Sequence, residues 1–437
     1  MSAPAGSDPY VPGHGSASYA VEHYDLDLGY KLVGNRLEGE AHLWCRAVTA
    51  LDTIALDLHV LRPSRVTLDD RAVAKYQHRN GKLLIRPASP ISAGQRFRVR
   101  VKYAGSPKPV PSKVLGPAGW EELVDGVIVA SQPHGAPSWF PCNDRPDDKA
   151  TYSIAVTAPS DYHVAVTGEP VTSRRSGSTT TWVYEQQHPM ATYLASVQIG
   201  QYDVAEVDAV VPITRVTPRP ADEAGYDAAF GEQPKMLEFF ESRFGPYPFP
   251  SYTCVITDDD LEIPLESQGL STFGRNFMVA DWEAIRLVAH ELSHQWFGNA
   301  VTLRAWHDIW LHEGFACYAE WLWSEESGSD TVQERAAKHH ARLAKLDQDL
   351  LVGDPGPALM FDDRVYKRGA LTLHALRADV GDDDFFEILR AWVATHSGGT
   401  VTTSMFIEHA SAVCGRDLTL LFTEWLYHPE LPGLPVV

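Results

Sequence analysis

The sequence predicts an α+β protein of two domains, in which a β-rich N-terminal domain precedes a mainly helical C-terminal domain. The chain has 437 residues, more than one hydrophobic core usually supports. Apolar and polar residues alternate through the first half, as in antiparallel strands with one buried and one wet face. From about residue 222 the apolar residues recur at helical spacing instead.

The alternating pattern predicts strands at residues 23–30, 96–103, 152–156 and 164–166. Turn-forming stretches, such as Ala104–Pro109 and Arg174–Ser178, separate them. A last strand-like segment, Ala191–Tyr202, comes before the change of period. We therefore predict one domain at residues 1–204 and a second at residues 205–437.

The second half is predicted to be mainly helical. Pro234–Phe244 has a proline near its first turn and is followed by Gly245, which ends helices readily. Tyr252–Asp258 is predicted as one more strand. Further helices are predicted at residues 282–298, 311–323, 332–346, 364–380, 385–395, 403–414 and 418–426.

Composition excludes several classes of partner. The net charge of -20 argues against nucleic acid or an anionic membrane. The chain has no run of about 18 apolar residues and no basic start followed by an apolar stretch, so neither a membrane span nor a signal peptide is predicted. The five cysteines form no C-x-x-C pair, which argues against a disulfide framework and a thiolate metal site. We expect a monomeric cytoplasmic protein.

The segment Val288–Gly298 contains the motif H-E-x-x-H. On a helix, residues four apart share one face, so His290 and His294 can present two imidazoles to one metal ion. Glu291 lies beside the first of them and can act as the general base toward the attacking water. Apolar neighbours predict that this helix is buried, which suits a dry catalytic cleft.

A catalytic zinc site needs a third protein ligand and an open position. Glu313, within Trp310–Ala316, lies on the next predicted helix, which can return antiparallel and complete a His₂Glu site for one zinc ion. Glu320 follows two turns later on the same face. It either orients a ligand histidine through its free ring nitrogen or is a solvated surface residue. His307 and His312 are interpreted as structural.

These motifs resemble a known family. His290–Asn299 and Trp310–Ala316 are similar to the zinc-site segments of the gluzincin aminopeptidases, the family of aminopeptidase N and leukotriene hydrolase. Three further segments resemble family markers in the expected order, from about residue 18 to the C-terminus: Trp139–Lys149, Phe244–Phe249 and Val365–Ala370.

The resemblance implies a β-saddle N-terminal domain, a thermolysin-like catalytic domain, one zinc ion, and removal of N-terminal residues from peptides with a free N-terminus. The chain stops where the family's catalytic domain ends. The C-terminal helical domain of most relatives is therefore expected to be absent, which would leave the leaving-group side of the cleft open to longer substrates.

The resemblance also assigns residues. Tyr366 matches the tyrosine that donates to the oxyanion, its alternative being a core aromatic. Glu266 keeps the carboxylate of the family's amine-binding loop, although Pro264 and Ser267 depart from it. Gln132 is expected to line the pocket for the first side chain. His134 stands where relatives often have a second amine-binding glutamate, so we expect weaker amine anchoring.

Other functions are consistent with the same residues. One is a peptidase dedicated to a single peptide, either trimming a leader or cutting internally, and product analysis distinguishes it. The family also contains an epoxide hydrolase that uses the same zinc site, but no residue of this sequence points to a lipid pocket. An inactive binding module is disfavoured because every catalytic position is retained. A purely structural metal site is disfavoured because such sites usually have four protein ligands.

Overall fold

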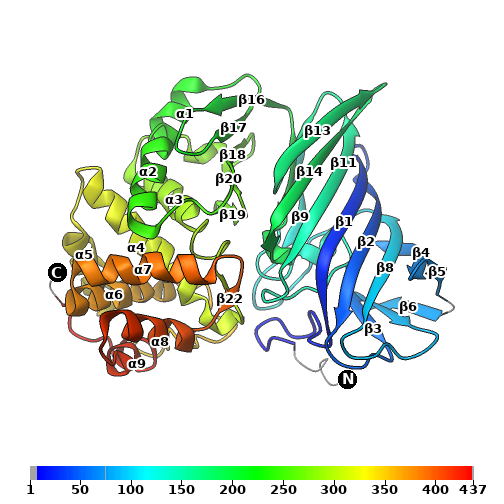
Figure 1. Ribbon diagram of the computed structural model, residues 1–437. Coiled ribbons are helices and arrows are strands. Elements are labelled where there is room, and N and C mark those ends of the chain that lie inside the picture. Colours follow the sequence, from blue (N-terminus) through cyan, green and yellow to red (C-terminus); the bar gives the residue numbers. More distant parts are fainter. Residues whose placement is uncertain (1–6, 74, 436–437) are drawn as a thin grey trace.

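The computed structural model describes residues 7–73 and 75–435. A β-rich domain and a mainly helical domain lie side by side in Figure 1, in the order that the sequence predicts. In the described part of the chain, no helix combines the length and apolar character that a membrane crossing requires.

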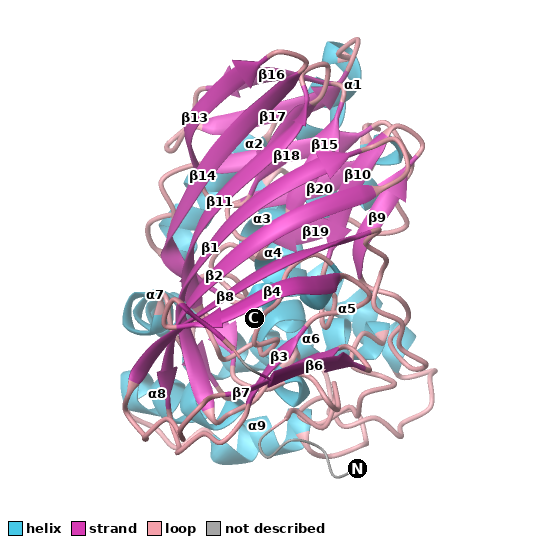
Figure 2. Cartoon of the chain, turned by 90° about the vertical axis from the view of Figure 1, so that its right-hand side faces the viewer, coloured by secondary structure: helices cyan, strands magenta, loops and turns pink. Residues whose placement is uncertain are grey.

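The first domain is built on a large sheet, seen with the helical domain behind it in Figure 2. Within residues 7–73 and 75–435 this sheet has eight strands in the order β13-β14-β11-β1-β2-β8-β4-β5. Its alternating strands bury one face, and Tyr24, Leu26 and Leu28 are fully buried. The strands are β1 (Tyr19–Lys31), β2 (Arg36–Ala47), β4 (Arg62–Leu68), β5 (Arg71–Ala72), β8 (Arg96–Gly105), β11 (Ala150–Pro159), β13 (Glu169–Ser176) and β14 (Thr179–Met190).

One pairing in this sheet departs from the antiparallel arrangement that the sequence predicts. β1 and β11 pair in parallel, from His23 opposite Thr151 to Gly29 opposite Thr157. The long connection between them lets β11 return in the same direction as β1. Two smaller sheets complete the domain: β3 (Ile54–Asp57), β7 (Lys82–Arg86) and β6 (Lys75–Arg79), and β12 (His163–Val166), β15 (Val197–Gly200), β10 (Gly126–Ala130) and β9 (Gly119–Leu123).

The second domain begins with its own sheet, in the order β16-β17-β18-β20-β19. The chain leaves the first domain at Gln201, between β15 and β16, so residue 204 lies inside a strand of the second domain. These strands are β16 (Tyr202–Val207), β17 (Ile213–Pro218), β18 (Tyr252–Thr257), β19 (Leu265–Ser267) and β20 (Leu270–Gly274). A two-stranded sheet pairs β21 (Thr302–Leu303) with β22 (Thr400–Val401).

The helices follow the predicted positions with two differences. A helix at α1 was not predicted, and α3 ends at Ser293 rather than at residue 298. After Ser293 the chain tightens into turns, in which the Gln295 and Trp296 amides donate to carbonyl oxygens three residues back. Gly298 follows with a φ of +131° and lies so close to His294 that a Cβ would approach its ring to 3.3 Å. The helices are α1 (Glu223–Phe230), α2 (Gln233–Phe244), α3 (Trp282–Ser293), α4 (Trp310–Glu326), α5 (Val332–Leu343), α6 (Asp363–Val380), α7 (Asp382–His396), α8 (Thr403–Cys414) and α9 (Thr419–Leu426).

The N-terminal segment contacts both domains (Figure 1). Asp8 accepts from the Trp306 backbone amide at 2.7 Å, and the Tyr10 hydroxyl donates to Asp354 at 2.5 Å, both in the second domain. A few residues on, His14 lies 2.7 Å from Asp144 in the first domain. Residues 8–16 therefore join the two domains in addition to the covalent link at Gln201.

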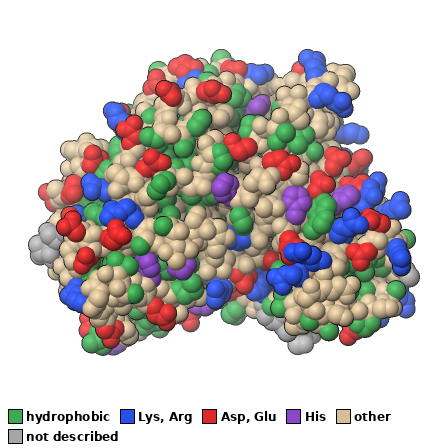
Figure 3. All heavy atoms as spheres, in the orientation of Figure 1, with side chains coloured by type: hydrophobic (Ala, Val, Ile, Leu, Met, Phe, Trp, Pro, Cys, Tyr) green, Lys and Arg blue, Asp and Glu red, His purple; other side chains and the backbone are tan. Residues whose placement is uncertain are grey.

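Charge on the surface is locally compensated. On the face drawn in Figure 3, acidic side chains are scattered widely and Lys and Arg gather toward the outer edge of the first domain. Three arginines of β8 pair with carboxylates nearby: Arg96 with Glu22, Arg98 with Asp70 and Arg100 with Glu40. This pairing disfavours the edge as a nucleic-acid surface, in keeping with the net charge of -20.

Helices α4 and α6 cross at a pair of glycines. A Cβ on Gly369 would lie 2.9 Å from the Gly314 Cα, so only glycine permits this approach of the two backbones. The crossing brings Tyr366 and Lys367 of α6 beside the functional face of α4.

We predict that Gly369→Ala destabilises the protein by about 1–3 kcal/mol, because the added methyl group overpacks the crossing. Helix propensity alone predicts the opposite sign, a gain of up to about 1 kcal/mol. The free energy of urea unfolding measures the difference, and Gly433→Ala, where a Cβ meets open space, is the control. A more stable Gly369→Ala variant contradicts the packing argument.

Candidate metal centre and active site

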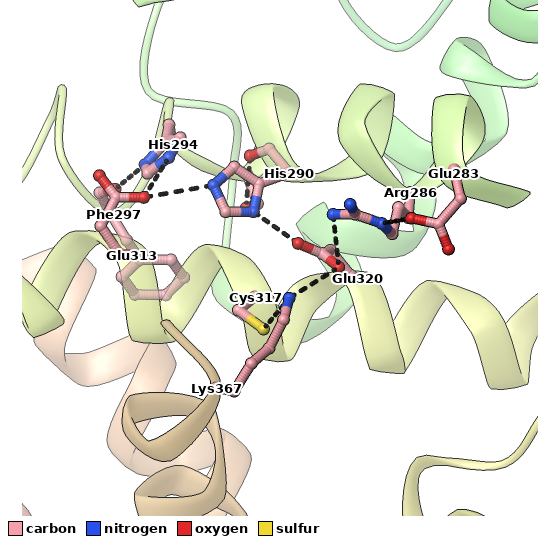
Figure 4. A network of polar contacts seen from close by, with 10 residues as sticks. Glu283, Arg286, His290, His294, Phe297, Glu313, Cys317, Glu320 and Lys367 are labelled. Carbon is pink, nitrogen blue, oxygen red and sulfur yellow. Dashed lines mark hydrogen bonds and ion pairs between the residues drawn. The ribbon is translucent and has the colours of Figure 1, made fainter. Parts of the chain in front are cut away.

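Three ligating side chains converge between α3 and α4, which run in opposite directions in Figure 4. The Asp281 side chain caps α3 by accepting from the Ala284 amide, and the helix presents His290 and His294 one turn apart. Glu313 faces them from the first turn of α4. One ligand atom from each lies within 4.8 Å of the others, and all three side chains are buried.

Hydrogen bonds fix the orientation of both imidazoles. Nδ1 of His290 lies 2.7 Å from Glu320 Oε1, and Nδ1 of His294 lies 3.0 Å from the Phe297 carbonyl oxygen. Both Nε2 atoms therefore face the Glu313 carboxylate, at 3.3 and 3.5 Å from its Oε2. Two imidazoles with engaged outer nitrogens plus one carboxylate form a donor set that fits a divalent transition metal, and zinc above all.

The ligating groups compensate one another's burial. Burial alone lowers the pKa of His294, but Glu313 outweighs it and raises that pKa to about 10. The same two imidazoles lower the pKa of Glu313 against its own burial. Such a cluster holds positive charge between its members, as protons or as a metal cation.

Glu320 is a buried residue rather than a solvated one, with 2% of its surface exposed. Figure 4 shows it between His290 and two cations. Its Oε2 lies 3.8 Å from Lys367 Nζ and 3.5 Å from Arg286 Nη1. Burial alone would raise its pKa, but Lys367 and the bond to His290 lower the pKa of Glu320 to about 2. An anionic Glu320 therefore faces the outer nitrogen of His290.

Glu291, next to the metal ligand His290, is buried and keeps one carboxylate oxygen free of hydrogen bonds within the described part of the chain. It is 4% exposed, and its Oε2 has no hydrogen-bond partner among the described residues. Burial, reinforced by the nearby Glu266 carboxylate, raises the pKa of Glu291 to about 8. A buried carboxylate with a free oxygen and a raised pKa is suited to exchanging a proton with a small molecule such as water.

A second carboxylate lies at the boundary between the domains. Glu266, on β19, accepts from Gln132 Nε2 of the first domain at 2.6 Å. Asn299 Nδ2 donates to the backbone oxygens of Glu266 and Ser267, at 2.9 and 3.1 Å. Gln132 and Glu266 together line a small depression with a free volume of about 10 Å³. The two domains thus each contribute to this part of the site.

The remaining predicted residues lie in different places. Tyr366 is at the metal centre, where its ring stacks on His290 with centroids 6.0 Å apart. His134 is 2% exposed; its Nε2 donates to the Val110 carbonyl oxygen at 3.1 Å, and its ring packs against His14. These contacts direct the His134 side chain into the first domain. His312, interpreted as structural, accepts from the Leu303 amide at 2.8 Å.

Sequence reasoning missed three residues of the site: Arg286, Asn299 and Lys367. Arg286 lies one turn before His290, so its place on the same helical face was a usable signal. Lys367 lies within the segment Val365–Ala370, but α6 carries several other charged residues, so its charge alone was no signal. Asn299 gave no signal, because its partners on β19 are brought near only by the fold.

A β-rich domain followed by a helical domain with H-E-x-x-H and a downstream glutamate defines a metallopeptidase of the gluzincin class. Comparison with known proteins gives the same answer. The Peptidase M1 N-terminal domain model matches residues 20–194, and the Peptidase family M1 domain model matches residues 228–425. The chain belongs to peptidase family M1.

Relatives span a wide range of organisms. Aminopeptidase Ey of Gallus gallus is 29% identical over 371 residues, covering 77% of this chain and 38% of that protein. Probable aminopeptidase 1 of Sulfurisphaera tokodaii is 24% identical over 435 residues, covering 95% of this chain and 54% of that protein. The chain thus spans about half or less of the length of these curated relatives.

A solved structure matches over the whole length. The M1 zinc metallopeptidase of Deinococcus radiodurans is 31% identical, with a TM-score of 0.89, and the match covers 98% of this chain and 99% of that one. A mutant of the Deinococcus protein has been solved bound to a Tyr-Ser-Ala substrate, and a two-domain M1 zinc metallopeptidase mutant bound to L-arginine.

We predict that Glu320→Gln weakens zinc binding by roughly 10- to 100-fold, because a neutral amide supports the His290 ring less well than a carboxylate does. Competition with a chromophoric chelator measures the affinity. The matched control is Glu326→Gln, an exposed position on the same helix. Equal zinc affinity in both variants would mean that Glu320 does not tune the metal centre.

Proposed function

We propose that the protein is a zinc-dependent aminopeptidase that removes N-terminal residues from peptides. The observation that carries this proposal is the presence, in one site, of a His₂Glu cluster, a free buried Glu291 oxygen and a separate carboxylate at Glu266. The first two features suit peptide hydrolysis in general. The third supplies the negative charge that a free α-amine requires.

One zinc ion held by His290, His294 and Glu313 would polarise the scissile carbonyl and acidify water. Glu291 accepts the proton of the attacking water on its free carboxylate oxygen and later delivers it to the leaving amine. Its burial keeps bulk water from competing for this proton. The raised pKa of Glu291 brings its proton affinity close to neutral pH, where both transfers are efficient.

Tyr366 donates a hydrogen bond to the oxyanion that forms when the carbonyl is attacked. Its phenol keeps its proton, since burial raises the pKa of Tyr366 above the usual range. The ring is held against His290, beside the proposed zinc ligands. One such donor typically contributes about 3 kcal/mol, or roughly a hundredfold in rate.

Glu266 binds the protonated α-amine, and Gln132, which donates to that carboxylate, holds it in place and lies beside the first side chain of the substrate. His134 offers no fixed negative charge, and its contacts lie within the first domain. Amine recognition therefore depends on the single carboxylate of Glu266. This supports the expectation of weaker amine anchoring than in relatives with two glutamates.

We further propose that the protein acts as a monomer in the cytoplasm. Gln132 and Glu266 come from the same chain, so one copy contains both halves of the site. Within the described residues all five cysteines are free, as is usual in a reducing compartment.

The test uses a peptide pool in matched free and N-acetylated forms, with products identified by mass spectrometry. We expect successive single-residue losses from free peptides only, abolished by a chelator and restored by zinc. Internal cleavage of both free and acetylated peptides would show that the protein is an endopeptidase and not an aminopeptidase. Processing of a single peptide from the pool would indicate a dedicated peptidase.

We predict that Glu266→Gln lowers kcat/KM for free peptides by roughly a hundredfold, mainly through KM, because a charge-assisted bond worth about 1.5–3 kcal/mol is lost. Glu262→Gln, an exposed carboxylate just before β19, is the control and should leave KM unchanged. If both variants have the same KM as the unmodified protein, the amine is bound elsewhere.

A further inference from the structure

Lys149 crosses from the first domain into the second. It immediately precedes β11, and its Nζ donates to the backbone oxygens of Asn299 at 2.9 Å and Ala300 at 3.1 Å. The Thr302 hydroxyl oxygen lies 2.9 Å away and the Gly399 carbonyl oxygen 3.5 Å away. Four uncharged oxygens of the second domain therefore surround the single amino group of Lys149, whose pKa is lowered to about 7 by burial.

The segment that Lys149 contacts is the turn after the H-E-x-x-H helix, residues 297–303, here called the post-helix loop. This loop orients two functional groups. The Phe297 carbonyl oxygen engages Nδ1 of His294, and the Asn299 side chain holds the β19 backbone at Glu266. A displacement of the loop would therefore move a metal ligand and the proposed amine-binding carboxylate together.

A lysine side chain matches these four oxygens better than an arginine or an apolar side chain would. Lysine presents three donors from a compact charge at the end of a flexible stem, which matches oxygens converging from several directions. The planar guanidinium of arginine is larger and does not fit the same convergence. An apolar side chain would remove the one group that joins these four oxygens, although the carbonyl oxygens would keep their bonds within the second domain, such as that from the Gly398 amide to Ala300.

We propose that Lys149 is a positioning residue, which docks the first domain onto the post-helix loop and, through Asn299, keeps Glu266 opposite Gln132. Gln132–Glu266 and Lys149–Asn299 are two bridges across the same domain boundary, and the Asn299 side chain connects them. The part that concerns the amine rests on the proposed aminopeptidase function.

The test compares Lys149→Met with the zinc-loaded unmodified protein. Calorimetry measures the Kd of L-arginine as a free amine probe, and steady-state kinetics separate KM from kcat. We expect Kd and KM to rise about tenfold while kcat changes less than threefold. Lys75→Met, an exposed lysine of β6 in the same domain, is the matched control and should bind L-arginine normally.

A double-mutant cycle tests the route through Asn299. Asn299→Ala alone should also weaken L-arginine binding, and combining it with Lys149→Met should add little, because both changes break one chain of contacts. Fully additive effects would overturn this route. If Lys149→Met lowers the melting temperature but leaves Kd and KM unchanged, Lys149 stabilises the domain interface without positioning Glu266, and the proposal is wrong.

Two further outcomes are informative. If Lys149→Met does not fold, Lys149→Arg is used instead, because its basic but planar side chain fits the four converging oxygens less well. Normal L-arginine binding by Lys149→Arg overturns the proposal. If the unmodified protein neither binds L-arginine nor trims peptides, the proposed function is wrong. In that case the zinc affinity tests the positioning role of Lys149, because the same loop contacts His294 through the Phe297 carbonyl oxygen. An unchanged zinc affinity in Lys149→Met would refute that role.

Discussion

The structure depends on placing several ionisable groups inside a helical core where each alone would be unfavourable. His290, His294, Glu313 and Glu320 are all at most 5% exposed. An isolated buried charge costs many kcal/mol, so these groups can remain only as a mutually compensating set. Glu313 faces both imidazoles, and Glu320 lies between His290 and the cations Lys367 and Arg286. The charge pattern that permits burial is also the one that gathers a metal cation.

Backbone packing supplies the geometry that this charge set requires. The Gly314–Gly369 crossing lets α6 approach α4 closely enough for Lys367 to reach Glu320 and for Tyr366 to lie against His290. Gly298 turns the chain directly after α3, so that the Phe297 carbonyl oxygen meets the His294 ring. In both places a side chain larger than hydrogen would occupy space that the site itself needs.

The sequence could predict what depends on local spacing. His290 and His294 share a helical face whatever surrounds them, and the alternation in the first half follows from one-sided burial. It could not predict contacts between distant segments. Examples are the parallel pairing of β1 with β11, the bond from Lys149 to Asn299 and the burial of His134 in the first domain. These contacts depend on how separate elements pack, and they leave no periodic pattern in a single sequence.

Chemistry and recognition are therefore carried by different parts of the fold. The groups proposed for hydrolysis lie on α3, its C-cap His294, α4 and α6, all within the second domain, where helix packing and the bonds from Glu320 and the Phe297 carbonyl oxygen fix them. The proposed amine site requires Gln132 from the first domain and Glu266 from the second, so its geometry depends on how the domains dock. Residues 8–16 and Lys149 hold that docking from two separate points. Changes at the domain boundary should consequently alter which peptides are accepted before they alter the hydrolytic step.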